Sequence, residues 1–216
     1  MDSSSAPPSP YHEQRLEQFL DDLASGRPTP GGGSSAALVG AVGAALVSMV
    51  GNYTVGREKY REVEARAQEA LDRTEALRAD LVHLIQADID AFGEVSAAYK
   101  LPRATDEDKA ARSEAIQRAL VTATEAPLAI ARAAGEILSL SRTMAEIGNP
   151  QTISDVGVGA LAADACLRSA ALNVEINLKH MKDEERIAAY RGEMDRLLEG
   201  GEDRLRDILD TVRERL

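Results

Sequence analysis

The chain has 216 residues, with 36 acidic and 25 basic side chains and a formal charge of −11. This length allows one large domain or two small ones, and the acidic balance argues against nucleic acid as the main partner. The single cysteine, Cys166, excludes a disulfide within the chain, and three scattered histidines argue against a zinc site, so we expect no metal. A reducing cytoplasm fits both features.

The sequence begins with a polar tail that precedes a single expected domain. Residues 1–10 are rich in Pro and Ser and lack the basic start and apolar run of a signal peptide, so we expect a disordered tail. Residues 11–216 are expected to form one helical domain, since Trp is absent and Phe and Tyr are few. A first helix is predicted over 12–25, ended by Gly26 and Pro28.

An unusually apolar helix follows a loop with three consecutive glycines. Residues 35–53 are apolar on nearly every side, and their length is near the lower limit for a membrane span. The segment is rich in Ala and Gly rather than Leu and lacks basic flanks, so we expect no membrane span. We interpret it as the central helix of a bundle, in which Gly40 and Gly43 allow close helix packing.

The remaining helices are predicted from amphipathic spacing and from helix breakers. Pro102 and the Gly148-Asn149-Pro150 turn end two long helices, while Thr105 and Asp183 are expected to cap helix starts. No strand pattern stands out, so the predicted class is all-α, an antiparallel bundle of about five or six helices. The expected spans are 58–101, 105–147 with a kink at Pro127, 154–180, and 183–216 with an interruption at Gly200-Gly201.

Asp88 is the residue on which the functional interpretation depends most. It shares a helix face with Ile85, Phe92 and Val95, which recur at spacings of three and four and make that face largely apolar. Partial burial raises the pKa of a carboxyl group and suits it to general acid–base chemistry. The alternative is a structural ion pair with another helix. Asp90 falls on a different face.

The glycine-rich loop is a second candidate for ligand binding. Gly31, Gly32, Gly33 and Ser34 lead into a helix N-terminus, where free N–H groups and the positive dipole end suit a carbonyl, carboxylate or phosphate. No strand precedes this loop and no Gly-Lys-Ser/Thr follows it, so it is neither a Rossmann fingerprint nor a Walker loop. A tight connection between two helices explains the same residues equally well.

Two amides on the 154–180 helix form a third candidate. Asn173 and Asn177 align with Ser169 at spacings of four, and buried amides need partners. A polar heterocycle or the neighbouring helices can supply them, and the second alternative is slightly favoured by the residues alone. The histidines, His180 among them, are isolated and receive no role. Basic residues near helix ends form either a local cationic rim or solvated surface: Arg57, Lys59, Lys100, Arg103 and Lys179.

Seven motifs, in one order along residues 14–210, resemble the cyclodeaminase/cyclohydrolase family. This family includes the C-terminal domain of formiminotransferase–cyclodeaminase and stand-alone methenyltetrahydrofolate cyclohydrolases. No single motif is diagnostic, but their order is specific. They are Pro28-Thr-Pro-Gly-Gly-Gly-Ser34, Val55-Gly-Arg-Glu-Lys-Tyr60, Asp88-Ile-Asp-Ala-Phe92, Ala98-Tyr-Lys-Leu-Pro102, Gly148-Asn149, Ile153-Ser-Asp-Val-Gly157 and Ala170-Ala-Leu-Asn-Val-Glu-Ile-Asn177.

The resemblance implies an all-helical dimer with a tetrahydrofolate site in a cleft between helices. It implies site roles for Asp88, Asn149, Asp155, Asn173 and Asn177, which match the family pattern. Arg57-Glu58 stands where members often show two lysines, which puts a tail-binding role for these two positions in doubt, while Lys59 still matches.

The resemblance leads to a specific hypothesis for the activity. We expect hydrolysis of 5,10-methenyltetrahydrofolate to 10-formyltetrahydrofolate, with no bound cofactor and the folate as substrate. The alternatives are a formimidoyltetrahydrofolate cyclodeaminase and a non-catalytic helical subunit. The expected catalytic residues are Asp88, Asp155 and Asn177, and the expected substrate-binding residues are Gly31, Gly32, Gly33, Ser34, Lys59, Lys100, Asn149 and Asn173.

Overall fold

The computed structural model describes residues 10–216, so the predicted tail lies almost entirely outside the described residues. The all-α class is confirmed: within the described part, seven α-helices and three short 3-10 segments occur and no strand. The α-helices are α1 (Leu16–Ala24), α2 (Gly32–Thr54), α3 (Glu64–Tyr99), α4 (Asp106–Ile147), α5 (Ile153–Leu178), α6 (Glu184–Leu198) and α7 (Gly201–Glu214). The 3-10 segments are η1 (Tyr11–Glu13), η2 (Glu58–Val63) and η3 (Pro150–Thr152).

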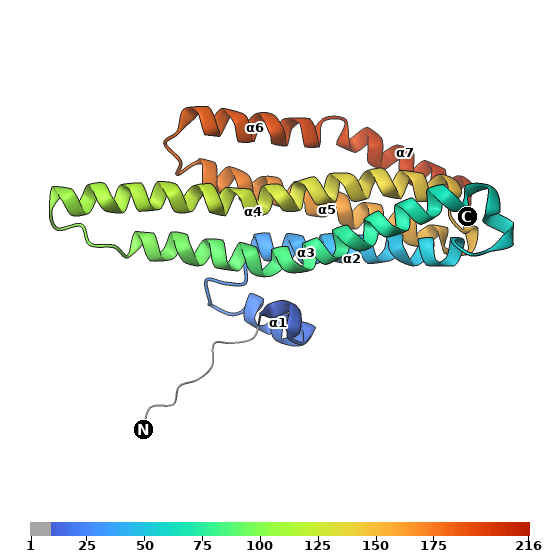
Figure 1. Cartoon of the computed structure of the whole chain (residues 1–216), viewed down its shortest axis with the longest axis horizontal. Coiled ribbons are helices and arrows are strands. Elements are labelled where there is room, and N and C mark those ends of the chain that lie inside the picture. The colour runs from blue at the N-terminus through green and yellow to red at the C-terminus, as the bar shows by residue number, and fades with distance from the viewer. Residues whose placement is uncertain (1–9) are drawn as a thin grey trace, which may run out of the picture.

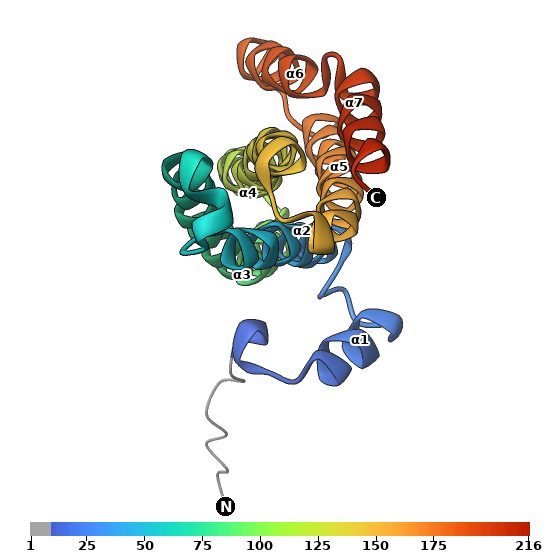
Figure 2. The ribbon, with the colours of Figure 1, turned by 90° about the vertical axis from the view of Figure 1, so that its right-hand side faces the viewer.

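Helices α2 to α5 form the core of the bundle (Figures 1 and 2), and α2 packs against the other three. By length and composition α2 is apolar enough to cross a membrane, and here most of it is buried inside the bundle. Its glycines permit the close contact that the sequence predicted. A Cβ at Gly43 would lie 2.9 Å from the carbonyl oxygen of Gly159, and one at Gly40 would lie 2.7 Å from Sγ of Cys166.

Most predicted helix ends are close to the observed ones, and the exceptions have local causes. Thr105 caps α4 through the N–H of Asp108, and Asp183 caps α6 through the N–H of Arg186. The long helix predicted from residue 58 begins as α3 at Glu64, because η2 takes the 3-10 conformation first. The α4 helix continues through the buried Pro127 without interruption.

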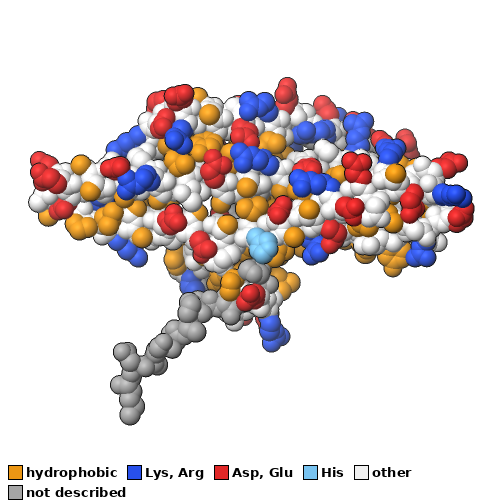
Figure 3. All heavy atoms as spheres, viewed as in Figure 1, with side chains coloured by type: hydrophobic (Ala, Val, Ile, Leu, Met, Phe, Trp, Pro, Cys, Tyr) orange, Lys and Arg blue, Asp and Glu red, His pale blue; other side chains and the backbone are white. Residues whose placement is uncertain are grey.

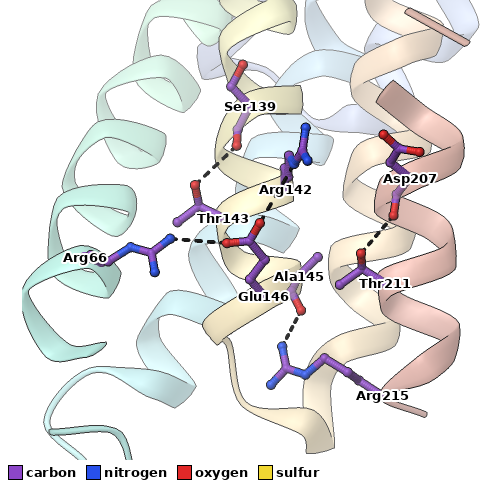
Figure 4. Close-up of polar contacts among 9 residues, drawn as sticks. All are labelled: Arg66, Ser139, Arg142, Thr143, Ala145, Glu146, Asp207, Thr211 and Arg215. Atoms are coloured by element: carbon purple, nitrogen blue, oxygen red, sulfur yellow. Dashed lines mark hydrogen bonds and ion pairs between the residues drawn. The ribbon is translucent and has the colours of Figure 1, made fainter. Parts of the chain in front are cut away.

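The end of the bundle where α2 and α4 terminate is tied together by polar contacts (Figure 4). The guanidinium of Arg215, just beyond α7, donates to the carbonyl oxygens of Ala145 and Gly148 and so satisfies acceptors at the end of α4. Glu146 on α4 pairs with Arg66 of α3 and with Arg142 of α4. These contacts fix the end of the bundle opposite to the cavity described below.

The other end is more open. The last turns of α3 and the first turns of α4 extend beyond the start of α2 (Figure 1). In the same view, α1 lies below α2 and outside the bundle. The N–H of Tyr11 donates to Gln86 on α3, and its hydroxyl donates to Asp22, which also pairs with Arg27. The face shown in Figure 3 carries acidic and basic side chains interspersed with apolar ones, so no single-sign patch dominates it.

Candidate active site

A cavity of about 720 Å³ lies at this open end, between the loop before α2 and the helices α3, α4 and α5. A volume of this size suits a small organic ligand. The lining residues combine apolar walls with a few polar groups, as is usual for such sites. They include Pro28, Thr29, Gly31, Gly32, Gly33, Asp88, Phe92, Val95, Ser96, Tyr99, Leu120, Ala123, Asn173, Ile176, Asn177 and His180.

Asp88 lines this cavity, and its carboxylate lies against the first turn of α2. A Cβ built on Gly33 would lie 2.0 Å from Oδ1 of Asp88, so the carboxylate occupies the space that any side chain at residue 33 would need. Burial raises the pKa of Asp88, and a hydrogen bond from the backbone N–H of Ser34 partly opposes that rise. A half-buried carboxylate with a raised pKa is suited to exchange protons with a bound ligand.

Two glycines of the loop, Gly32 and Gly33, are explained by the space that a side chain would need and not by backbone conformation. Among the described residues only Gly56 and Gly200 have positive φ, so the backbone conformation at residues 31–33 does not itself require glycine. Gly31 is the N-cap of α2, and α2 starts at Gly32, three residues earlier than predicted. A Cβ at Gly32 would lie 3.3 Å from Oδ1 of Asn173, which is a tight contact.

The two amides predicted on α5 both reach the cavity. Nδ2 of Asn177 donates to the carbonyl oxygen of Ala123 on α4 at 2.6 Å, and Nδ2 of Asn173 donates to Ser169 one turn earlier on α5 at 2.8 Å. Asn177 therefore has the partner on a neighbouring helix that the alternative interpretation expected, whereas Asn173 is paired within α5 itself. No donor from residues 10–216 occupies either side-chain oxygen, so both oxygens remain available to a ligand.

His180 lines the cavity although the sequence argument assigned it no role. It follows Asn177 by three residues, so it continues the spacing of Asn173 and Asn177, which was the signal that could have placed it. Leu120 and Ala123 of α4 also line the cavity, but nothing in the sequence distinguishes them from other apolar residues of a helix.

The other expected site residues lie elsewhere in the chain. Asn149 is a structural hub at the opposite end: its side chain accepts from Tyr60 and donates to the carbonyl oxygen of Tyr53, and its N–H donates to Thr54. Asp155, in the first turn of α5, is separated from Asn173 by about 27 Å of helix.

The two predicted lysines lie at different ends of the bundle. Lys59 is in η2, near the end of α2 that is about 30 Å from the cavity, and its amino group lies 5.4 Å from the ring centroid of Tyr60. Lys100 is the C-cap of α3 and directly follows Tyr99 of the cavity wall. Within one chain, therefore, Asn149, Asp155 and Lys59 do not meet Asp88.

Comparison with known proteins places this architecture in one family. The profile of formiminotransferase-cyclodeaminase matches residues 15–196, which is most of the chain. This chain belongs to that family. It is 52% identical over 183 residues to a methenyltetrahydrofolate cyclohydrolase of Methylorubrum extorquens, with 83% of this chain and 88% of the relative covered. The resemblance found in the sequence is confirmed.

Two more distant relatives are about a third identical to this chain. A formimidoyltransferase-cyclodeaminase of Sus scrofa is 35% identical over 200 residues, which cover 93% of this chain but 37% of the relative. The crystal structure of formiminotetrahydrofolate cyclodeaminase from Thermotoga maritima has a TM-score of 0.78 and 30% identity, covering 95% of this chain and 97% of the other. The names of the Methylorubrum extorquens and Thermotoga maritima proteins are those of enzymes that act on tetrahydrofolate derivatives.

Proposed function

We propose that this protein is a methenyltetrahydrofolate cyclohydrolase, which hydrolyses 5,10-methenyltetrahydrofolate to 10-formyltetrahydrofolate. The observation that carries the proposal is the half-buried Asp88 carboxylate in a cavity with apolar walls and two amides. The 52% identity to a protein of that name, over nearly its full length, supports the same reaction.

The reaction needs a water molecule, a proton acceptor and a way to balance positive charge. Water adds to the carbon of the amidinium cation that joins N5 and N10, giving a tetrahedral carbon. Asp88 accepts a proton from that water, and as an anion it also stabilises the cation before attack. Breakage of the bond from carbon to N5, with a proton delivered to N5, leaves the formyl group on N10 and releases one proton overall.

The remaining cavity residues suit the other parts of a folate. The side-chain oxygens of Asn173 and Asn177 can accept hydrogen bonds from a pterin, and Phe92 and Tyr99 offer aromatic surface to a flat ring. The N–H groups at the start of α2, around Gly32, can hold a carbonyl group. Lys100 directly follows Tyr99 and can meet the glutamate tail, whereas Lys59 is at the far end of the bundle.

The alternative function is the cyclodeaminase reaction. It is favoured by the name of the Thermotoga maritima structure and by the name of the Sus scrofa relative. There N10 attacks the formimino carbon of 5-formiminotetrahydrofolate, and ammonia leaves from a tetrahedral carbon. The product is the methenyl compound that the cyclohydrolase consumes, so the same carboxylate suits either reaction. A cytoplasmic location and the use of no bound cofactor belong to both versions of the proposal.

Purified protein offered each substrate separately distinguishes the functions. We expect the absorbance of methenyltetrahydrofolate to fall faster than in the uncatalysed hydrolysis, and no ammonia to be released from the formimino substrate. Ammonia release alone would establish the cyclodeaminase. Folate binding without turnover of either compound would identify a binding subunit and overturn both enzymatic proposals.

A further inference from the structure

A narrow strip of side chains on α3 leads along the cavity wall from the candidate catalytic carboxylate towards the open end of the bundle. Its members recur at spacings of four, three and four, so they fall within roughly 60° of one another around the helix axis. About 16 Å of helix separates the first from the last. We call this set the α3 strip: Asp88, Phe92, Val95 and Tyr99. Phe92 and Tyr99 are each 44% exposed, so both leave ring surface free for a ligand.

The charged end of a folate decides in which direction the molecule lies along the α3 strip. Its glutamate tail carries carboxylates, which are costly to remove from water, so the tail leaves the cavity through the open end. In a folate the reacting carbon lies between the pterin on one side and the p-aminobenzoyl ring, with its tail, on the other. With the reacting carbon at Asp88, the p-aminobenzoyl ring therefore lies along the strip towards Tyr99. The pterin is left beside the start of α2, where Gly32 approaches the amide of Asn173.

Arg112, near the start of α4, holds Tyr99 by two separate contacts. Its Nε and Nη2 donate to the carbonyl oxygen of Tyr99 at 3.2 and 3.0 Å, which satisfies an acceptor at the end of α3. Its guanidinium carbon also lies 5.4 Å from the centroid of the Tyr99 ring, within the range of a cation–π interaction. The first contact fixes the backbone and the second fixes the ring. Arg112 does not line the cavity, so it acts on a bound ligand through Tyr99.

We propose that Tyr99 forms the subsite for the p-aminobenzoyl ring of the folate and that Arg112 is the positioning residue of this subsite. The ring of Tyr99 stacks on the p-aminobenzoyl ring in the offset arrangement that aromatic pairs prefer. Arg112 keeps the Tyr99 ring in the orientation that this stacking needs. The inference rests on the proposed function, because it takes the ligand to be a folate whose reacting carbon lies at Asp88.

Binding of a whole folate and of its pterin part tests the subsite without any measurement of turnover. The probes are 5-formyltetrahydrofolate and 6-methyltetrahydropterin, which lacks the p-aminobenzoylglutamate part, in calorimetric titrations that use displacement for the weaker ligand. Tyr99→Leu should weaken binding of the folate about tenfold, and Arg112→Gln about threefold to tenfold. Neither variant should change the affinity for the pterin by more than about twofold. Arg118→Gln is the matched control on α4, because Arg118 is exposed, pairs with Glu114 and does not line the cavity.

The double variant Tyr99→Leu/Arg112→Gln separates positioning from a general effect on stability. If Arg112 acts through Tyr99, the double variant should bind the folate no more weakly than Tyr99→Leu alone. Additive losses, or equal losses for the folate and the pterin, would overturn the inference. A wild type that binds the folate but turns over neither substrate refutes the proposed function and leaves the subsite standing. A wild type that does not bind the folate overturns both.

Discussion

At the scale of single residues, two features of the surroundings of Asp88 shift its pKa in opposite directions. Burial favours the protonated form, while the N–H of Ser34 favours the anion. Substitution by Asn keeps the shape and an oxygen acceptor for that N–H but removes the proton exchange. The residue can therefore be tested without loss of the helix start.

Asp88→Asn should lower turnover by about a hundredfold to ten-thousandfold, the usual contribution of a general acid–base group. The measurement is the decay of methenyltetrahydrofolate absorbance, corrected for uncatalysed hydrolysis. Asp90→Asn is the matched control, because Asp90 is exposed and accepts a hydrogen bond from Gln86 outside the cavity. Near-wild-type turnover in Asp88→Asn, or a greater loss in Asp90→Asn, would refute the assignment.

The pH dependence of activity should report the same carboxylate. A general base works only when deprotonated, so kcat/KM should fall towards acid pH with an apparent pKa above the ordinary value of 3.8, since burial raises the pKa of Asp88. In Asp88→Asn this acid limb should disappear from the residual activity. An acid limb that persists unchanged in the variant belongs to another group.

The substitution Asp88→Asn, which should lower activity, should not lower the free energy of unfolding at neutral pH. A carboxyl group whose pKa is raised by folding stabilises the folded state below its unfolded pKa, and that stabilisation is lost as pH rises through the folded pKa. Asp88→Asn should therefore be at least as stable as the wild type at neutral pH, with the difference shrinking on acidification. Denaturant unfolding at several pH values measures this, and a large destabilisation at neutral pH would contradict it.

At the scale of elements, the start of α2 matters because its glycines leave room for a side chain of another helix. Gly33→Ala should reduce turnover about a hundredfold or more, since its Cβ would lie 2.0 Å from Oδ1 of Asp88 and displace the carboxylate. Gly26→Ala is the control, because a Cβ there meets nothing within 4 Å and Gly26 does not line the cavity. Equal activity in the two variants would show that the loop is only a connection.

The sequence predicts helices better than it predicts which helices meet. Thr105 and Asp183 mark helix starts through local hydrogen bonds, so spacing and cap residues suffice to find them. The contact between Gly33 and Asp88 joins residues 55 positions apart in the chain, and no local pattern indicates it. Asn149, for which the family resemblance implies a site role, makes hydrogen bonds to α2 and η2, and no local pattern in the sequence indicates these contacts either.

At the scale of the whole molecule, the cavity is built by four segments that the fold brings to one end of the bundle. Its chemistry needs no metal in the reaction that we propose. Prolonged treatment with EDTA, followed by removal of the chelator, should leave turnover unchanged. Loss of activity that zinc restores would contradict this and would require ligands from more than the described residues.

The close packing of α2 on α5 makes Cys166 an internal reporter of how the bundle opens. Its sulfur lies against Gly40, and burial raises the pKa of the thiol to about 12, so a thiol-specific reagent cannot react while the two helices stay in contact. The rate of modification therefore measures the fraction of molecules in which this contact has separated. If modification accelerates with denaturant in parallel with the loss of helical circular dichroism, the core opens only by global unfolding. A rate insensitive to denaturant would instead reveal local breathing between α2 and α5.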